Sequence, residues 1–207
     1  MASVYDLKPK FQNLLRPLLS FLVKNRFTPN IITMIALLGS VIAGVIVYFA
    51  NVNLNYLLIL PIWLFLRMAL NAIDGMMARE FNMSSDLGAV LNELGDVISD
   101  LVLYFPLVFV DRASSFPIIL FCVGAIITEL CGILGKALGA SRHYEGPMGK
   151  SDRAFFIGTL TFITVIIPNM LSFWKWFFIA GIILLILTCK NRISNALLEL
   201  KRENGGN

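Results

Sequence analysis

Residues 71–100 read NAIDGMMAREFNMSSDLGAVLNELGDVISD, and long apolar segments lie on both sides of them. Spacings of three and four residues place side chains on one face of an α-helix. Amide and carboxylate side chains follow these spacings here, at Asn71, Asp74, Asn92, Asp96 and Asp100. The pattern predicts two helices that turn oxygen-bearing side chains toward each other, joined by a short link at residues 80–87.

The composition is that of a membrane protein. Of the 207 residues, 57% are hydrophobic and 14% are charged, whereas soluble domains are about 45–50% apolar and about 25% charged. No ten-residue segment alternates apolar and polar positions, which argues against a membrane β-barrel. A spanning helix needs about 20 mostly apolar residues. We predict an all-α integral membrane protein with six transmembrane helices, near residues 29–50, 54–72, 88–110, 117–138, 154–168 and 173–189.

The N-terminal segment has a different pattern. In residues 1–28, basic side chains are spread among apolar positions at helical spacing, without the uninterrupted apolar core of a cleavable signal peptide. This predicts an amphipathic helix at the cytoplasmic membrane surface, interrupted at Pro17. The expected organisation is therefore this helix, a six-helix transmembrane catalytic domain at residues 29–190, and a basic cytoplasmic tail at residues 191–207.

The basic residues predict the orientation in the membrane. If the N-terminus is cytoplasmic, every one of the seventeen Lys and Arg residues except Arg67, Arg112 and Lys175 falls on the cytoplasmic side. Cytoplasmic loops carry an excess of Lys and Arg, so both termini are expected in the cytoplasm of a bacterium, below its inner membrane. The net charge of +4 suits anionic lipid headgroups or an anionic substrate and requires no nucleic acid.

The depths of the polar residues can be compared. A helix rises about 1.5 Å per residue, so in an antiparallel pair Asp74 lies level with Asn92, and Asn71 with Asp96. Arg67 and Asp100 lie deeper, at matching heights. The sequence thus predicts an oxygen cluster near the cytoplasmic interface with an ion pair below it.

This cluster has the residue types of a phosphate and metal site. Carboxylates at membrane depth are tolerated where they face a cavity, a partner or an ion, and amide and carboxylate oxygens suit Mg²⁺, Mn²⁺ or Ca²⁺ rather than zinc. Gly75 and Ala78 leave room beside Asp74, and Arg79 offers a planar cation to phosphate. The combination favours a nucleotide diphosphate whose oxygens a divalent ion bridges.

The same residues resemble the signature of the CDP-alcohol phosphatidyltransferases, D-x2-D-G-x2-A-R-x8-G-x3-D-x3-D. The segment TPNIIT, residues 28–33, is also similar to the family's entry to its first span. Asn71 and Asn92 stand where the family has its first and third aspartates, which resembles a bacterial inner-membrane subgroup. The positions that match are Asp74, Gly75, Ala78, Arg79, Gly88 and Asp96.

The resemblance implies a reaction and a set of roles. A CDP-linked donor, often CDP-diacylglycerol, would transfer its substituted phosphoryl group to an alcohol and release CMP, in phospholipid biosynthesis by a homodimer. The family's last aspartate is its proposed base, which makes Asp96 the candidate catalytic residue. Family members bind two divalent ions through the four aspartate positions, so Mg²⁺ or Mn²⁺ would here be bound by Asn71, Asp74, Asn92 and Asp96. The nucleotide would be bound by Asp74, Gly75, Ala78, Arg79 and Gly88.

The two asparagines leave three outcomes open. The site could hold two metal ions weakly, hold one, or bind a nucleotide without turnover. Because the Gly, Ala, Arg and last Asp of the signature are intact, we expect a working enzyme. The alternatives are a catalytically silent relative that binds nucleotide or lipid, and a small transporter. The second is disfavoured because the polar residues crowd the cytoplasmic half of the spans.

Two further groups of polar residues have competing interpretations. In the link at residues 139–153, Arg142, Lys150 and Arg153 would bind a phosphate of the donor or acceptor, although positive-inside anchoring explains the same charges. Arg67, Asp100 and Glu129 would form either an acceptor pocket or, as we favour, a buried ion network. The acceptor itself stays open among glycerol phosphate, serine, inositol derivatives and simple alcohols.

Overall fold

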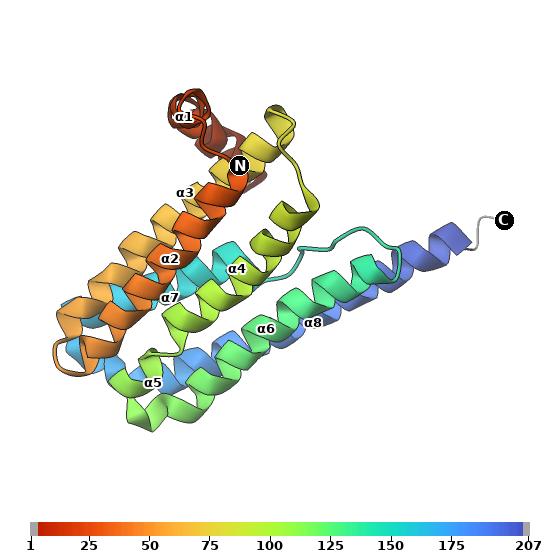
Figure 1. Ribbon diagram of the computed structural model, residues 1–207. Coiled ribbons are helices and arrows are strands. Elements are labelled where there is room, and N and C mark those ends of the chain that lie inside the picture. Colours follow the sequence, from red (N-terminus) through yellow and green to blue (C-terminus); the bar gives the residue numbers. More distant parts are fainter. Residues whose placement is uncertain (1–3, 205–207) are drawn as a thin grey trace.

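The computed structural model describes residues 4–204, and these form helices joined by short links without any strand (Figure 1). The predicted N-terminal helix and basic tail include residues 1–3 and 205–207, which lie outside this range. The α-helices are α1 (Val4–Lys24), α2 (Pro29–Tyr48), α3 (Ile59–Glu80), α4 (Asp86–Tyr104), α5 (Leu107–Val110), α6 (Ser115–Ala137), α7 (Lys150–Ile166) and α8 (Trp174–Asn204). Short 3-10 turns occur at η1 (Phe49–Asn51), η2 (Leu54–Leu58), η3 (Arg112–Ser114) and η4 (Pro168–Phe173).

Four helical segments are long and apolar enough to cross a membrane. The candidate spans have mean hydropathies between 1.8 and 2.5, at Pro29–Asn51, Leu54–Glu80, Arg112–Ala137 and Pro168–Arg202. The other two predicted spans coincide with α4, which carries four acidic residues, and with α7, which has only 17 residues. Four of the six expected spans are thus supported by length and composition, and spanning by α4 and α7 stays a prediction.

Helix α2 occupies the centre of one half of the molecule. It packs against both α3 and α4, which approach each other chiefly through side chains. Glycines explain these close contacts: a Cβ on Gly39 would lie 2.0 Å from the Trp63 ring of α3, and one on Gly44 would lie 2.2 Å from the Val102 carbonyl of α4. The expected face-to-face pair of α3 and α4 is therefore a three-helix arrangement around α2.

The other half is built on α6 and α8, which pack along each other (Figure 1). Helix α4 connects the two halves because it also contacts α6, while α7 packs against α3. Helix α8 runs without a break from Trp174 to Asn204, across the domain boundary predicted at residue 190. Its basic C-terminal turns are thus a continuation of the helix.

A large apolar cluster occupies the end of the bundle far from α1. It includes Phe121, Trp174 and Phe178. The Phe178 ring packs edge to face against Phe121 and Trp174, with ring centroids 5.4 and 6.0 Å apart. The Trp174 indole N–H donates to the Thr164 hydroxyl at 2.8 Å, so the ring is buried with its polar atom satisfied. This apolar end leaves the buried charges to the opposite end of the helices.

Helix α1 docks on the end of α3 where the polar signature begins. Leu19 is 2% exposed and packs with Ile73, Met76 and Met77, and Arg16 pairs with Glu80 at 2.9 Å. The helix passes through Pro17, so the interruption expected there does not end it. The chain then turns into α2, where Thr28 accepts a hydrogen bond from the Ile31 N–H as N-cap and Pro29 follows at the first helical position.

Candidate active site

Four helices bring charged side chains together in the half of the bundle nearer α1. Helix α3 contributes Arg67, Asn71 and Asp74, and α4 contributes Asp96 and Asp100. The first turn of α7 adds Lys150 and Arg153, and α6 adds Glu129. All of these except Asn71 and Lys150 are buried. Charged side chains at membrane depth are tolerated only when they have close partners.

Asp96 is surrounded by donors on both carboxylate oxygens. Its Oδ1 accepts from Arg67 Nη2 at 2.9 Å and from Asn71 Nδ2 at 2.8 Å. Its Oδ2 accepts from Lys150 Nζ at 2.5 Å. The residue is 6% exposed. Asn71 and Asp96 therefore meet as their equal depths predicted, and two cations from different helices hold the carboxylate in place.

Asp74 is equally buried but has different partners. It is also 6% exposed, and its Oδ2 accepts from the Thr33 hydroxyl of α2 at 2.8 Å. Among the side chains that the structure describes, no Lys or Arg forms an ion pair with it. The level partner predicted for it was Asn92, but α2 lies between the helices and supplies Thr33 instead. Asp74 is thus a buried carboxylate that has a hydroxyl donor but no ion-pair partner among the described side chains.

The remaining signature residues surround Asp74 and the start of α4. Arg79 is exposed at the end of α3, and its Nη1 lies 3.3 Å from the point where a Cβ on Gly75 would stand. Gly75 therefore gives the Arg79 side chain room beside Asp74. A Cβ on Gly88 would lie 2.8 Å from the Asn30 side chain, so this glycine serves the approach of α4 to α2. Ala78 and Asn92 are half-buried.

A buried ion network lies next to Asp96. Arg67 Nη1 donates to Asp100 Oδ1 at 2.6 Å, as the sequence predicted for this pair. Arg153, which is 1% exposed, donates through Nε to Asp100 at 2.9 Å and through Nη2 to Glu129 at 2.9 Å. Arg192 of α8 lies 3.4 Å from Glu129. The favoured interpretation of Arg67, Asp100 and Glu129 as a network that holds the helices together matches these contacts.

Arg142 and Arg153 both pair with acidic side chains of the protein. The Arg153 Nη1 donates to the Thr128 hydroxyl and the Met148 carbonyl, so each of its nitrogens has a protein partner. Arg142 pairs with Glu93 and, at 3.1 Å, with Glu129. These contacts agree with anchoring, and phosphate binding by either arginine stays a prediction. Lys150, with a side chain 23% exposed, is the cation of the link that reaches the edge of the site.

The link between α6 and α7 is fixed to α8 by a histidine. His143 Nε2 lies 2.8 Å from Glu199 Oε2, and Nδ1 lies 3.1 Å from Glu145. The hydrogen bond with Glu145, together with that to Glu199, raises the pKa of His143 above its ordinary value of 6.5. The position of His143 in a polar link does not reveal this contact, because the proximity of residues 143 and 199 follows from the packing of α6 against α8.

The side chains around Asp74 are of the kind that holds a divalent ion together with other ligands. Among the side chains that the structure describes, in residues 11–202, no three from His, Cys, Asp or Glu gather closely enough to enclose a metal by themselves. Mg²⁺, however, is usually held by one or two carboxylates together with water and substrate phosphates. Asp74 provides such a carboxylate, and the Asn71 amide, whose nitrogen is turned to Asp96, provides a neutral oxygen nearby on the same helix.

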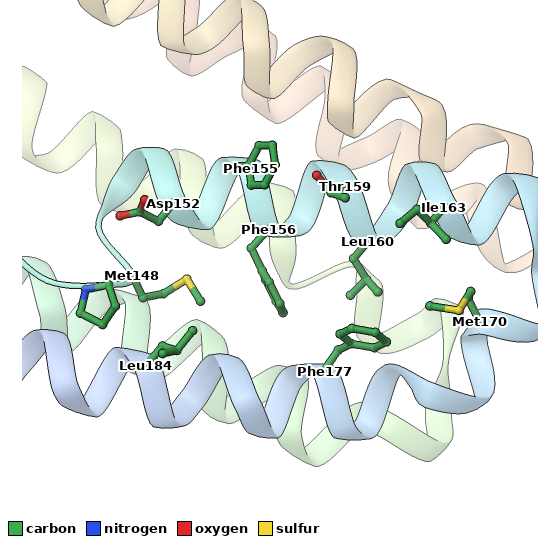
Figure 2. A pocket seen from close by; sticks show the side chains of 11 residues that line it. Met148, Asp152, Phe155, Phe156, Thr159, Leu160, Ile163, Met170, Phe177 and Leu184 are labelled. Carbon is green, nitrogen blue, oxygen red and sulfur yellow. The ribbon is translucent and has the colours of Figure 1, made fainter. Parts of the chain in front are cut away.

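An apolar cavity of about 320 Å³ lies apart from this site, between α7 and α8 (Figure 2). Phe155 and Phe156 from α7 and Phe177 from α8 line it, together with Met148 and Met170. Asp152 stands at one end, where its carboxylate accepts the Gly149 N–H at 3.0 Å. None of the predicted site residues lines this cavity.

Comparisons with known proteins agree with the resemblance found in the sequence. The family model for CDP-alcohol phosphatidyltransferase matches residues 26–190. The chain is 43% identical over 196 residues to the inner membrane protein YnbA of Escherichia coli (strain K12), covering 95% of this chain and 97% of that protein. It is also 35% identical over 94 residues to an uncharacterized protein of Aquifex aeolicus (strain VF5), and this match covers 45% of this chain and 45% of that protein.

The fold matches solved structures of phosphatidylinositol phosphate synthase (PgsA1) from Mycobacterium tuberculosis. The structure with CDP-DAG bound has a TM-score of 0.73 at 20% identity, covering 87% of this chain and 92% of that one. The structure in complex with manganese and citrate has the same TM-score and identity, with 87% and 88% covered. At this identity the likeness shows the fold. The match of the family model over most of the sequence shows that the chain belongs to the CDP-alcohol phosphatidyltransferase family and is a membrane phosphotransferase of that family.

Proposed function

We propose that this protein transfers a substituted phosphoryl group from a CDP-linked donor, such as CDP-diacylglycerol, to an alcohol and releases CMP. The acceptor hydroxyl loses its proton, its oxygen bonds to the phosphorus that bears the lipid, and the bond from that phosphorus to the CMP oxygen breaks. The observation that carries the proposal is the pairing of two buried carboxylates with different partners, Asp74 beside Thr33 and Asp96 beside Lys150. One suits cation binding and the other suits proton transfer.

The donor side of the site is assigned to α3. A divalent ion bound there would neutralise the diphosphate of the donor. Asp74 would hold it, with the amide oxygen of Asn71 as a further ligand. Gly75 and Ala78 place no bulky side chain on this face of α3, so a nucleotide can lie close to the helix. The exposed Arg79 is placed to contact a phosphate oxygen.

The acceptor side is assigned to Asp96. Arg67 and Asn71 fix Oδ1, so the carboxylate keeps one orientation, and Oδ2 faces the partly exposed Lys150. An acceptor hydroxyl that enters at Lys150 would meet Oδ2, which takes its proton in general base catalysis. Active-site opening at the cytoplasmic face, and both termini in the cytoplasm, follow from the placement of the basic residues.

The test is CMP release by purified protein supplied with CDP-diacylglycerol and candidate alcohols, in Mg²⁺ and then in Mn²⁺. We expect CMP release that depends on both the metal and one acceptor. Asp96→Asn should lower the rate by about 10²–10⁴-fold, the usual contribution of a general base. The matched control is Asp86→Asn, an exposed carboxylate in the first turn of the same helix, which should keep the full rate. Absence of CMP release by the unaltered protein with every alcohol would refute the proposed reaction.

A further inference from the structure

The charged groups of the polar site balance without any metal. The acidic members are Asp74, Glu93, Asp96, Asp100 and Glu129, and the basic members are Arg67, Arg142, Lys150, Arg153 and Arg192. Each acid except Asp74 contacts at least one of these cations. The paired part of the cluster therefore carries one excess positive charge, which the unpaired Asp74 offsets.

We propose that this site binds a single divalent ion, at Asp74, because the ammonium of Lys150 keeps Asp96 out of the coordination shell. The inference rests on the proposed function and adds to it the number of metal ions and the residue that sets that number. Lys150 is a positioning residue in this account, since it acts through the carboxylate of Asp96.

The contacts of Asp96 support this division. Oδ1 already receives two N–H donors, and Oδ2 receives the Lys150 ammonium at 2.5 Å, so the lone pair that Oδ2 keeps lies beside a positive charge that repels a divalent ion. The ammonium is itself held from the other side by Glu129, at 3.7 Å. An ion bound at Asp96 would lie against this ammonium or displace it from its two carboxylate partners, Asp96 and Glu129.

The charge of the donor supports the same number. A diphosphate with ester groups at both ends carries two negative charges, so one divalent ion and one donor enter the balanced cluster without changing its net charge. With an uncharged acceptor, a second divalent ion would leave two uncompensated positive charges in a buried site, where unpaired charge is costly. The side chains of Asn71 and Asn92 are neutral and offset neither of these charges.

The number of ions is measured directly by titrating the purified protein with Mn²⁺ alone and following free Mn²⁺ by electron paramagnetic resonance. We expect one tightly bound Mn²⁺ per chain, lost in Asp74→Asn. In Lys150→Met combined with Asn92→Asp, we expect two, because Asp96 is released and a second carboxylate is added. Lys150→Arg keeps a cation on Asp96, and should bind one ion even if the methionine variant folds poorly. The control Lys136→Met alters an exposed lysine near the end of α6 and should also bind one.

Two tightly bound Mn²⁺ ions per unaltered chain, or none, would overturn the inference, and so would one ion in the folded Lys150→Met, Asn92→Asp variant. Failure here is distinct from failure of the proposed reaction. Two ions with normal CMP release would refute the single-ion site alone, whereas one ion without CMP release would refute the reaction alone. Turnover gives a second measure, since a single ion predicts a first-order dependence of CMP release on Mn²⁺.

Discussion

Asp74 and Asp96 show how two aspartates with the same burial acquire different chemistry. Both are 6% exposed, so their partners distinguish them. A hydroxyl from α2 contacts Asp74, whereas two cations and an amide contact Asp96. The spacing of the signature placed both residues on facing surfaces, but Thr33 and Lys150 come from helices whose arrangement no local spacing reveals.

At the same scale, Arg153 is expected to matter for stability more than for donor binding. Arg153→Met removes a guanidinium that is 1% exposed and leaves Asp100 and Glu129 with an uncompensated buried charge. Loss of one partner from a buried ion pair costs about 3–5 kcal/mol. Thermal unfolding in detergent should show a clear fall in Tm.

Arg79→Met is the matched control for this measurement, because Arg79 is an exposed arginine on α3. It should leave Tm nearly unchanged and instead raise the KM for the CDP-linked donor. A similar Tm in both variants would contradict the structural role assigned to Arg153.

At the scale of elements, α1 is an integral part of the site's support. Leu19 fills a cluster with Ile73 and Met77, which flank Asp74 on α3. Leu19→Ala removes a buried side chain, a change that typically costs about 2–5 kcal/mol in a packed core. Hydrogen exchange should therefore accelerate in α1 and at the C-terminal end of α3. Leu14→Ala, at a residue 74% exposed, should exchange at the unaltered rate, and equal exchange in both variants would show that α1 does not dock through Leu19.

The link between α6 and α7 should respond to pH through His143. Hydrogen bonds to Glu145 and Glu199 raise the pKa of His143 above 6.5. A raised pKa in the folded state means that the anchoring is fully present below pH 6.5 and is lost as the pH rises through the raised value. Proteolysis within residues 139–149 should become faster across that interval.

His143→Gln is the control for the pH response, because it keeps a polar side chain and removes the titration. Its proteolysis rate should vary much less with pH over the same interval. An unchanged pH dependence in this variant would assign the response to another group.

At the scale of the whole molecule, the sequence was sufficient for the helices and for part of the site. Runs of apolar residues predicted the long helices because membrane spans need about 20 such residues. Equal depth predicted the contact of Asn71 with Asp96 and of Arg67 with Asp100. The position of α2 between α3 and α4 was missed, because it depends on which side of α2 carries Gly39 and which carries Gly44. That position is why Asp74 meets Thr33 and not Asn92.

A similar reason applies to α7 and α8, whose residues are close to Asp96 in the structure but far from it in the sequence. Lys150, Arg153 and Arg192 lie fifty or more residues from Asp96 along the chain, yet they complete the charge balance around it. A charged loop near a membrane has positive-inside anchoring as an equally good explanation. Only the packing of α4 against α6, and of α7 against α3, distinguishes simple anchoring from a place in the charged cluster.

The ion network of five helices also constrains how this protein can change over generations. Each cation is matched with an acid on a different helix, as with Arg67 and Asp100 or Arg192 and Glu129. A mutation that alters one of these charges leaves its counterpart stranded in a medium that solvates it poorly. Viable descendants should therefore exchange such residues in compensating pairs, and their substitutions should be correlated between helices that are far apart in the gene.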